Sequence, residues 1–373
     1  MDWELNVKLR LGGIGVLLFS LPMLGQTPSP AHKTPPAAAN AAPGDYPVMS
    51  AAAKARTRQV FGYFEAGQAG ALYNAFAPPM KKSTSVANLS VLAKRVGSDW
   101  GHEQKMLGEN FVPDMLSVST VYSRFSQFSN SKDPIYTVLA VDRQGQVSAF
   151  HAQPRTPPPS VNRYSDYRDK ARLRLPFDGS WFVYEGGREV YQNRYVFSDL
   201  DRYSVVFTVL KDGQAFSGDG TRNEQFFCYG QPVMSPADGT VVMTVDKFAD
   251  NPPGRSEEIM PSGNRVLIFH GHGEYSLFMH LKRQSITVKA GDQLRQGDVI
   301  GECGNSGNSP APSLEYRLQN SKGVPVPLSL PAQFVNYVAD GTPVAWGEPL
   351  RGQTVRNHAA SADAVTTPTS DQN

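Results

Sequence analysis

Three residues in the last third of the chain have side chains that could carry hydrolytic chemistry. His280 ends an apolar run, and Ser313 and Glu315 alternate within the run Pro312-Ser313-Leu314-Glu315-Tyr316. Alternate residues of an extended strand share one face, so the Ser313 and Glu315 side chains are expected to point the same way. Imidazole and carboxylate groups serve as general acids, general bases and zinc ligands, and a hydroxyl can act as a nucleophile. These residues are the first candidates for a reactive site.

Two other arrangements of the same residue types need separate interpretation. His270-Gly271-His272 places two histidines at alternate positions, but it lies between two apolar runs and is typical of a hairpin turn. A structural His270 and an exposed His272 are therefore expected, with a metal site shared with His280 as the alternative. Ser313 and His280 could form a nucleophile and its base. However, no acidic third member is apparent, and the sharp Gly-x-Ser-x-Gly turn of many hydrolases is missing.

A series of phrases from residue 232 onward resembles the lysostaphin-type (LytM) zinc endopeptidase domain of peptidase family M23. The phrases occur in the same order as in that family, and the resemblance covers roughly Gly186 to Arg351. They are Pro232 to Gly239, the His270 hairpin, Met279-His280-Leu281, Val288 to Asp292, Gly301 to Gly307, and Val324 to Pro327. The resemblance implies a mainly-β domain with an antiparallel sheet core of the LytM or duplicated-hybrid-motif type.

The same resemblance implies that the metal site is dismantled. In the family a His, an Asp and the second His of a His-x-His strand bind zinc; here Tyr195, Val206 and Glu315 stand at those positions. Ser313 replaces the catalytic His beside the third ligand, and His280 is the surviving family position. A catalytic zinc needs three protein ligands, so no metal is expected in this site. If the register were shifted, three nearby aspartates could serve as ligands: Asp199, Asp201 and Asp219.

The part of the chain before this domain predicts an exported protein. Lys8 and Arg10 precede an apolar stretch from Leu11 to Leu24, which fits a signal peptide over residues 1–25 and is short for a membrane span. An uncleaved signal anchor is the alternative. Residues 26–53 are rich in Pro and Ala and predict a disordered linker. The mature protein is expected in the periplasm or outside the cell, and not as an integral membrane protein.

Residues 54–153 predict a separate α+β domain. Val60, Phe61 and Phe64 recur at helical spacing, and Ile135 to Val141 reads as a buried strand. Helices on a curved antiparallel sheet are similar to the nuclear-transport-factor-2-like fold. Residues 154–166 follow as a Pro-rich linker, residues 167–351 as the LytM-type domain, and residues 352–373 as a disordered tail.

The charge and the cysteines of the chain limit its partners and its redox chemistry. The net charge of +2 over 373 residues shows no basic excess of the kind that nucleic-acid binding requires. Cys228 and Cys303 could form a disulfide in an oxidising compartment or stay as buried thiols, and the sequence leaves both open.

The sequence supports three hypotheses of function. The first is a non-catalytic module that binds peptidoglycan stem peptides or an envelope protein; degenerate relatives activate cell-wall amidases, but this chain lacks their coiled coils and wall-binding repeats. The second is an active zinc metalloendopeptidase that cleaves peptidoglycan cross-links through non-standard ligands. The third is a docking protein whose activity lies in the N-terminal domain. Whether the chain is an enzyme stays open, and the first hypothesis is favoured because several family positions are replaced together.

Overall fold

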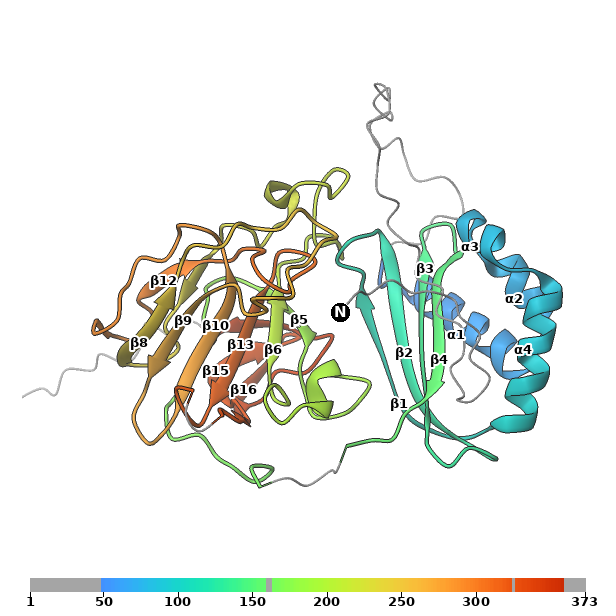
Figure 1. Ribbon diagram of the computed structural model, residues 1–373, viewed down its shortest axis with the longest axis horizontal. Helices are drawn as coiled ribbons and strands as arrows, with labels where there is room; N and C mark the ends of the chain where they lie inside the picture. Colours follow the sequence, from blue (N-terminus) through green and yellow to red (C-terminus); the bar gives the residue numbers. More distant parts are fainter. Residues whose placement is uncertain (1–47, 159–162, 324–325, 359–373) are drawn as a thin grey trace, which may run out of the picture. The chain divides into compact units, whose positions relative to one another are not determined.

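The computed structural model describes residues 48–158, 163–323 and 326–358. These residues form two compact units, which are described separately (Figure 1). The first unit contains residues 48–111 and 119–157, and the second contains Val112–Val118 and the residues from 158 onward. The expected signal peptide and the expected linker as far as residue 47 lie outside the described residues.

The first unit consists of four helices and a four-stranded sheet. The strands lie in the order β1-β2-β3-β4, and the helices lie together beside this sheet (Figure 1). The elements are α1 (Ala51–Glu65), α2 (Ala69–Ala75), α3 (Pro78–Ser83), α4 (Val86–Asp99), β1 (Glu103–Pro113), β2 (Ser119–Phe128), β3 (Ile135–Asp142) and β4 (Val147–Pro154). Helices and an antiparallel sheet were expected here and are found. The nuclear-transport-factor-2-like assignment stays a prediction.

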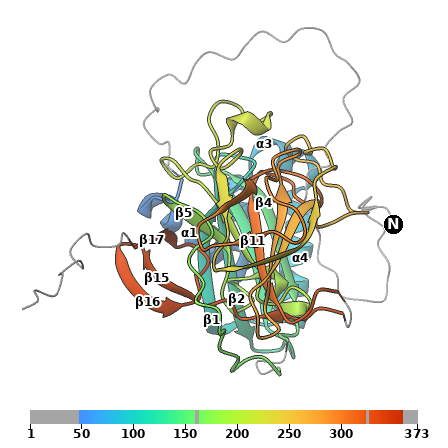
Figure 2. The ribbon, with the colours of Figure 1, turned by 90° about the vertical axis from the view of Figure 1, so that its left-hand side faces the viewer.

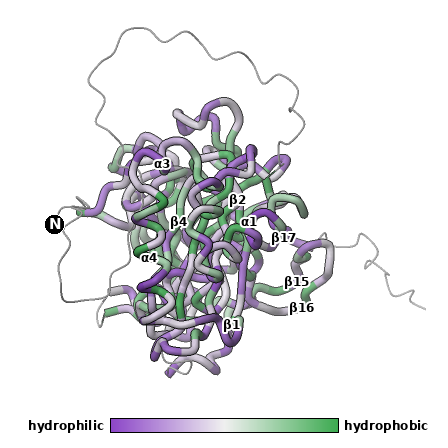
Figure 3. Tube along the Cα trace, turned by 90° about the vertical axis from the view of Figure 1, so that its right-hand side faces the viewer, coloured by the Kyte–Doolittle hydropathy of each residue, from purple (hydrophilic) through white to green (hydrophobic). Residues whose placement is uncertain are grey.

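The first helix begins earlier than the sequence analysis predicts. The Ser50 side chain accepts a hydrogen bond from the Ala53 amide at 3.1 Å, which caps α1 at its N-terminus. Residues 51–53, expected to belong to a disordered linker, are therefore helical. Val60 and Phe64 of α1 are buried in the core of this unit, and hydrophobic and hydrophilic residues alternate along its elements (Figure 3). The strand β1 was not anticipated.

The second unit is built on one large sheet. Its main path runs β11-β8-β9-β10-β13-β6-β5-β17-β15-β16, with β14 on β13, and a separate pair joins β12 to β7. The elements are β5 (Trp181–Glu185), η1 (Arg194–Phe197), β6 (Val205–Thr208), η2 (Asn223–Gln225), β7 (Pro232–Met234), β8 (Gly239–Val245), β9 (Asn264–Phe269), β10 (Tyr275–Leu281), β11 (Gln293–Leu294), β12 (Val299–Glu302), β13 (Leu314–Gln319), β14 (Ser329–Leu330), β15 (Phe334–Ala339), β16 (Thr342–Gly347) and β17 (Thr354–Asn357). The pairings in this sheet are antiparallel, as expected.

The expected hairpin between β9 and β10 is confirmed. Tyr275 pairs with Phe269, and the turn between them has positive φ angles at Gly271, His272 and Gly273. Glycine adopts this left-handed region without steric cost, which is why two of the three turn residues are glycines.

The prediction of a disordered tail from residue 352 is wrong for residues 354–357. These residues form β17, which pairs with β5 on one side and with β15 on the other (Figure 2). Val355 lies opposite Trp181 and Ala339 and is fully buried. The low apolar content of the segment concealed this strand, because one buried side chain and two sets of backbone hydrogen bonds are enough to hold it. Residues 359–373 lie outside the described residues.

Among the described residues, no helix is long and apolar enough to span a membrane.

Candidate functional site

The five residues expected at the remains of the metal site meet around one small cavity in the second unit. Tyr195 lies on η1, Val206 on β6, His280 on β10 and Glu315 on β13, and Ser313 immediately precedes β13. All five line a cavity of about 90 Å³. The structure therefore brings together positions that are up to 120 residues apart in the chain.

The register of the sheet explains most of this convergence. Glu315 lies directly opposite Val206 on β6 and opposite Met279 on β10. Paired residues of an antiparallel sheet have Cβ atoms about 5 Å apart, so Val206 and Glu315 are direct neighbours. Ser313 precedes Glu315 by two residues and lines the same cavity.

His280 reaches the cavity through a local distortion of β10. It follows Met279, so in a regular strand its side chain would point to the opposite face. The pairing of β10 with β9 is irregular between Phe278 and Leu281, and His280 has a φ of 64°. A positive φ is uncommon for a residue with a side chain and often marks a functional or constrained position. The distortion turns the imidazole toward Glu315.

One carboxylate oxygen of Glu315 is the centre of the site. The Tyr195 hydroxyl donates to Glu315 Oε2 at 2.7 Å, and His280 Nε2 lies 3.3 Å from the same oxygen. Burial would raise the pKa of Glu315, but its contacts with His280 and Tyr195 and the charge of Arg194 outweigh burial and lower the pKa. Glu315 is therefore an ionised carboxylate held by neighbouring side chains.

The hydrogen bonds of His280 define where its protons lie. Nδ1 lies 2.8 Å from the carbonyl oxygen of Ser306, which can only accept, so Nδ1 carries a proton. The contact between Nε2 and Glu315 is attractive when Nε2 is protonated as well. The side chains of His280 and Glu315 are 6% and 7% exposed, so this contact is shielded from solvent.

Tyr195 is held in place by residues that the sequence analysis did not identify. Arg194 Nη2 donates to the Tyr195 hydroxyl at 2.9 Å, and the guanidinium lies 4.9 Å from the centre of the Tyr195 ring. The Tyr195 amide donates to the Asn193 side chain, which itself donates to the carbonyl oxygens of Gly187 and Ser204. Burial and the Glu315 charge raise the Tyr195 pKa well above its ordinary value. No motif in the sequence singled out Arg194, because it precedes a replaced family position.

Ser313 has no base beside it. Its hydroxyl lies 3.3 Å from the Ala311 carbonyl oxygen, to which it donates, and 3.4 Å from the Ser309 hydroxyl. Among the contacts of the described residues, none joins Ser313 to His280, whose two ring nitrogens face Ser306 and Glu315. The arrangement does not support a serine nucleophile.

These residues do not match the donor set of a catalytic zinc ion. Val206 has no lone pair, and the Tyr195 phenol resists the loss of its proton. Of the three residues at the expected ligand positions, Glu315 alone offers a suitable donor, and its Oε2 already accepts from Tyr195 and contacts His280. Within the described residues, no three His, Cys, Asp or Glu side chains gather where they could hold a metal ion. We therefore derive no reaction step through zinc.

The two other histidine positions have structural surroundings. His270 Nδ1 lies 2.7 Å from the Asp238 carbonyl oxygen, and Nε2 lies 2.8 Å from the Ser276 hydroxyl. Burial lowers the His270 pKa. His272 is exposed in the turn. The expected roles of a structural and an exposed histidine agree with these positions.

The aspartates considered as alternative ligands do not line the cavity. Asp201 forms an ion pair with Arg317, and burial raises its pKa despite that partner. Asp199 and Asp219 are exposed.

The two cysteines lie together in the core of the second unit. Both are fully buried free thiols within hydrogen-bonding distance of each other. Cys228 also donates to the Pro312 carbonyl oxygen at 3.0 Å. A disulfide between them stays a prediction.

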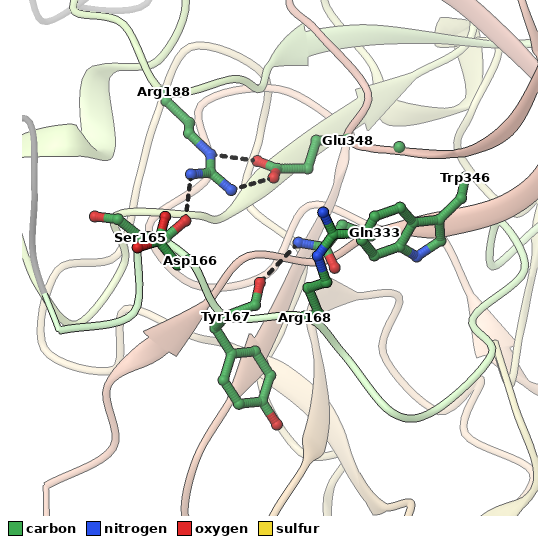
Figure 4. Close-up of a pocket in the computed structure, with 9 residues that line it drawn as sticks. Ser165, Asp166, Tyr167, Arg168, Arg188, Gln333, Trp346 and Glu348 are labelled. Carbon is green, nitrogen blue, oxygen red and sulfur yellow. Dashed lines mark hydrogen bonds and ion pairs between the residues drawn. The ribbon is translucent and has the colours of Figure 1, made fainter.

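A larger pocket of about 290 Å³ lies elsewhere on the second unit (Figure 4). Two of its charged groups are paired with each other: Arg188 donates to both carboxylate oxygens of Glu348 and also to the Ser165 carbonyl oxygen. Gln333 donates to the Tyr167 carbonyl oxygen. Because these groups satisfy one another, the pocket is a weaker candidate than the Glu315 cavity.

Comparison with known proteins identifies the type of the second unit. Residues 224–327 match the sequence model of Peptidase family M23. This match includes His280, Ser313 and Glu315 and begins after Tyr195 and Val206. Tyr195 and Val206 belong to the site because they line the same cavity as the three matched residues.

Curated relatives match this chain over a stretch of similar length. Peptidoglycan DD-endopeptidase ShyA of Vibrio cholerae is 37% identical over 89 residues, which are 24% of this chain and 17% of the relative. An uncharacterized metalloprotease of Haemophilus influenzae is 36% identical over 104 residues, 27% of this chain and 19% of the relative. Cell division protein DipM of Caulobacter vibrioides is 31% identical over 113 residues, 30% of this chain and 16% of the relative. The chain thus spans about a fifth of the length of these relatives.

Solved structures also align with this chain. A zinc-containing peptidase from Vibrio cholerae aligns with 15% identity and a TM-score of 0.28, over 58% of this chain and 57% of that one. The catalytic domain of lysostaphin from Staphylococcus simulans aligns with 18% identity and a TM-score of 0.25, over 41% of this chain and 88% of that one.

Proposed function

We propose that this chain is an exported cell-envelope protein whose peptidase-like unit binds peptidoglycan stem peptides without cleaving them. The observation that carries the proposal is the contact set of Glu315, whose carboxylate is held by Tyr195 and His280 where family members are expected to bind zinc. The Glu315 carboxylate already contacts two side chains and lies beside Val206. A carboxylate in these surroundings is suited to stabilising a fixed structure.

The chemistry of amide hydrolysis explains why cleavage is not expected. In metallopeptidases a metal ion activates water and polarises the scissile carbonyl. The lining contains one histidine, His280, and two carboxylates, Glu315 and Asp114; His280 and Glu315 contact each other at 3.3 Å, and Asp114 accepts a hydrogen bond from the Leu116 amide. A paired imidazole and carboxylate lack both an electrophile for the carbonyl and a free base for water.

The choice of ligand class follows from the relatives and from the exposed side of the cavity. One relative, ShyA, is named a peptidoglycan DD-endopeptidase, and another, Mpg of Neisseria meningitidis, is named a DD-carboxypeptidase/endopeptidase. A protein that keeps such a fold but loses the metal ligands can still hold the peptide. Arg194 is exposed and lines the cavity, so it can contact a ligand there.

The experiment measures binding and cleavage together. Full-length protein is incubated with purified peptidoglycan sacculi, with added zinc or with a chelator, and both co-sedimentation and release of soluble fragments are quantified. We expect the protein to sediment with the sacculi and to release no fragments with or without zinc. Soluble stem peptides should compete for binding.

Two variants test whether binding involves the cavity. Arg194→Gln removes a cation that lines it, whereas Arg283→Gln removes an exposed cation that does not. Sedimentation should weaken for the first variant and not for the second. Zinc-dependent release of fragments would establish the active-peptidase alternative. Absence of sedimentation would reject the peptidoglycan ligand and favour an envelope protein as the partner.

A further inference from the structure

A second recess lies on the same sheet face as Glu315. In the register of the sheet, Leu277 of β10 lies between Leu267 of β9 and Arg317 of β13. Arg317 follows Glu315 by two residues on one strand, so the two side chains share a face about 7 Å apart. The recess has a volume of about 270 Å³ and contains Leu267, Leu277 and Arg317 in its lining.

The recess has an apolar floor and a cationic rim. Leu267 and Leu277 are buried and pack with Met243, which is also in the lining. Among the described residues, the charged members of the lining are Arg265, Arg317 and Lys322, and none is an Asp or a Glu. The recess is therefore complementary to a ligand that is both apolar and negatively charged.

Arg265 is the cation that lacks a protein counter-charge. Arg317 forms an ion pair with Asp201, and Lys322 is exposed to solvent. Arg265 is half-buried and donates from Nη1 to the Gly263 carbonyl oxygen at 3.0 Å. Among the described residues, no carboxylate lies within ion-pair distance of its guanidinium. Partial burial lowers the pKa of Arg265, and no acidic neighbour counteracts this effect.

A partly buried guanidinium without a counter-charge is unfavourable, because it has lost part of its hydration. A carboxylate is the ligand group that offsets this cost most effectively, since it can accept two parallel hydrogen bonds from the planar guanidinium. The recess is smaller than the roughly 300–1,000 Å³ of pockets that enclose a whole drug-sized ligand. It therefore fits the end of a peptide.

We propose that this recess binds the carboxylate of a short peptide, with Arg265 as its ionic partner and with the small apolar side chains of the peptide against Leu267 and Leu277. The carboxylate is the chemical feature that the module recognises. The identity of the peptide as a peptidoglycan stem rests on the proposed function. The remainder of the ligand would extend along the sheet face toward Glu315.

The test uses two probes that differ in one group. Full-length protein is titrated with diacetyl-Lys-D-Ala-D-Ala as the free acid and with the same peptide as its C-terminal amide, by calorimetry at low and high salt. We expect the free acid to bind at least about tenfold more tightly than the amide, because a charge-assisted hydrogen bond is lost in the amide. The preference should decrease at high salt.

Three variants test whether Arg265 causes the preference for the free acid. Arg265→Gln should abolish the preference for the acid, and Arg265→Lys should retain part of it because the charge is kept. Arg295→Gln removes an exposed arginine outside the recess and should leave the preference unchanged. Thermal unfolding of each variant shows whether the fold is intact, and the lysine variant keeps the test informative if the glutamine variant misfolds.

The outcomes separate this inference from the proposed function. Equal binding of acid and amide, or a preference that survives Arg265→Gln, overturns the carboxylate recess even if the protein still sediments with sacculi. No binding of either probe also overturns it. If the protein prefers the free acid through Arg265 but does not sediment with sacculi, the carboxylate recess is supported and peptidoglycan is rejected as the source of the peptide.

Discussion

The hydroxyl of Tyr195 and the carboxylate of Glu315 lie 2.7 Å apart, although the residues are 120 positions apart in the chain. Val206 lies directly opposite Glu315 on the neighbouring strand. The three residues expected at the family's ligand positions are thus in mutual proximity, which agrees with the alignment of Tyr195 and Val206. Tyr195 and Glu315 form a hydrogen-bonded pair, and Val206 adds an apolar side chain beside them.

Tyr195→Phe should destabilise the second unit. The change removes the hydrogen bond that the hydroxyl donates to Glu315 and the one that it accepts from Arg194. Hydrogen bonds to charged groups contribute about 1.5–3 kcal/mol each to the free energy of unfolding. Urea denaturation of the full-length chain measures the loss. The control is Tyr275→Phe, since no hydrogen bond of the Tyr275 hydroxyl is found among the described residues and its ring packs on Phe269. Equal effects of the two changes would contradict the role of the Tyr195 hydroxyl.

Restoring the family's residues should restore metal binding. The combined variant Tyr195→His, Val206→Asp and Glu315→His places three zinc ligands around the same cavity. After zinc loading and dialysis, elemental analysis should find close to one equivalent in this variant and a small fraction of an equivalent in the natural sequence. The variant that lacks Val206→Asp serves as the control and should hold zinc more weakly. A full equivalent in the natural sequence would mean that the ligands have been misidentified.

Asp169 should make the second unit less stable as the pH rises. Burial raises its pKa to about 7, and the charges of Glu274 and Glu348 act in the same direction, against hydrogen bonds from Gln333 and Trp346. The unfolded chain releases this proton near its ordinary pKa of 3.8. Between about pH 4 and pH 7 the folded state therefore binds more protons than the unfolded state, and stability falls as the pH rises through that window.

The variant Asp169→Asn removes this titration. We expect its melting temperature to exceed that of the natural sequence at pH 8 and the difference to shrink near pH 4. Asp178, an exposed aspartate of the same unit, provides the control as Asp178→Asn. A difference between Asp169→Asn and the natural sequence that does not vary with pH would show that Asp169 acts through its contacts alone.

The final strand should be essential for folding of the second unit. Ending the chain after Gly352 removes β17, which lies between β5 and β15 and buries Val355. We expect this truncation to abolish the cooperative thermal transition of the unit, whereas ending the chain after residue 358 should preserve it. Val355→Ala should cost about 1–3 kcal/mol through the cavity that it leaves. If both truncations melt alike, β17 contributes little.

Local patterns were sufficient for the elements that are defined by short-range chemistry. The hairpin from β9 to β10 follows from apolar runs around glycines, and the helical spacing of Val60, Phe61 and Phe64 predicted α1. The start of α1 at Ala51 and the strand β17 were missed. The first depends on a single serine cap, and the second depends on two partner strands, of which β5 lies more than 150 residues earlier in the chain.

The sequence by itself determined the type of the second unit and the chemical identity of the residues at the family's positions, because ordered phrases and residue types are properties of the chain alone. The tertiary structure decided which contacts those residues make with one another. Only the sheet register places Val206 against Glu315, only the distortion of β10 turns His280 toward the same carboxylate, and only the packing of distant strands leaves Arg265 without an acidic partner. Distances and desolvation arise between segments that are far apart in sequence, and no local pattern encodes them.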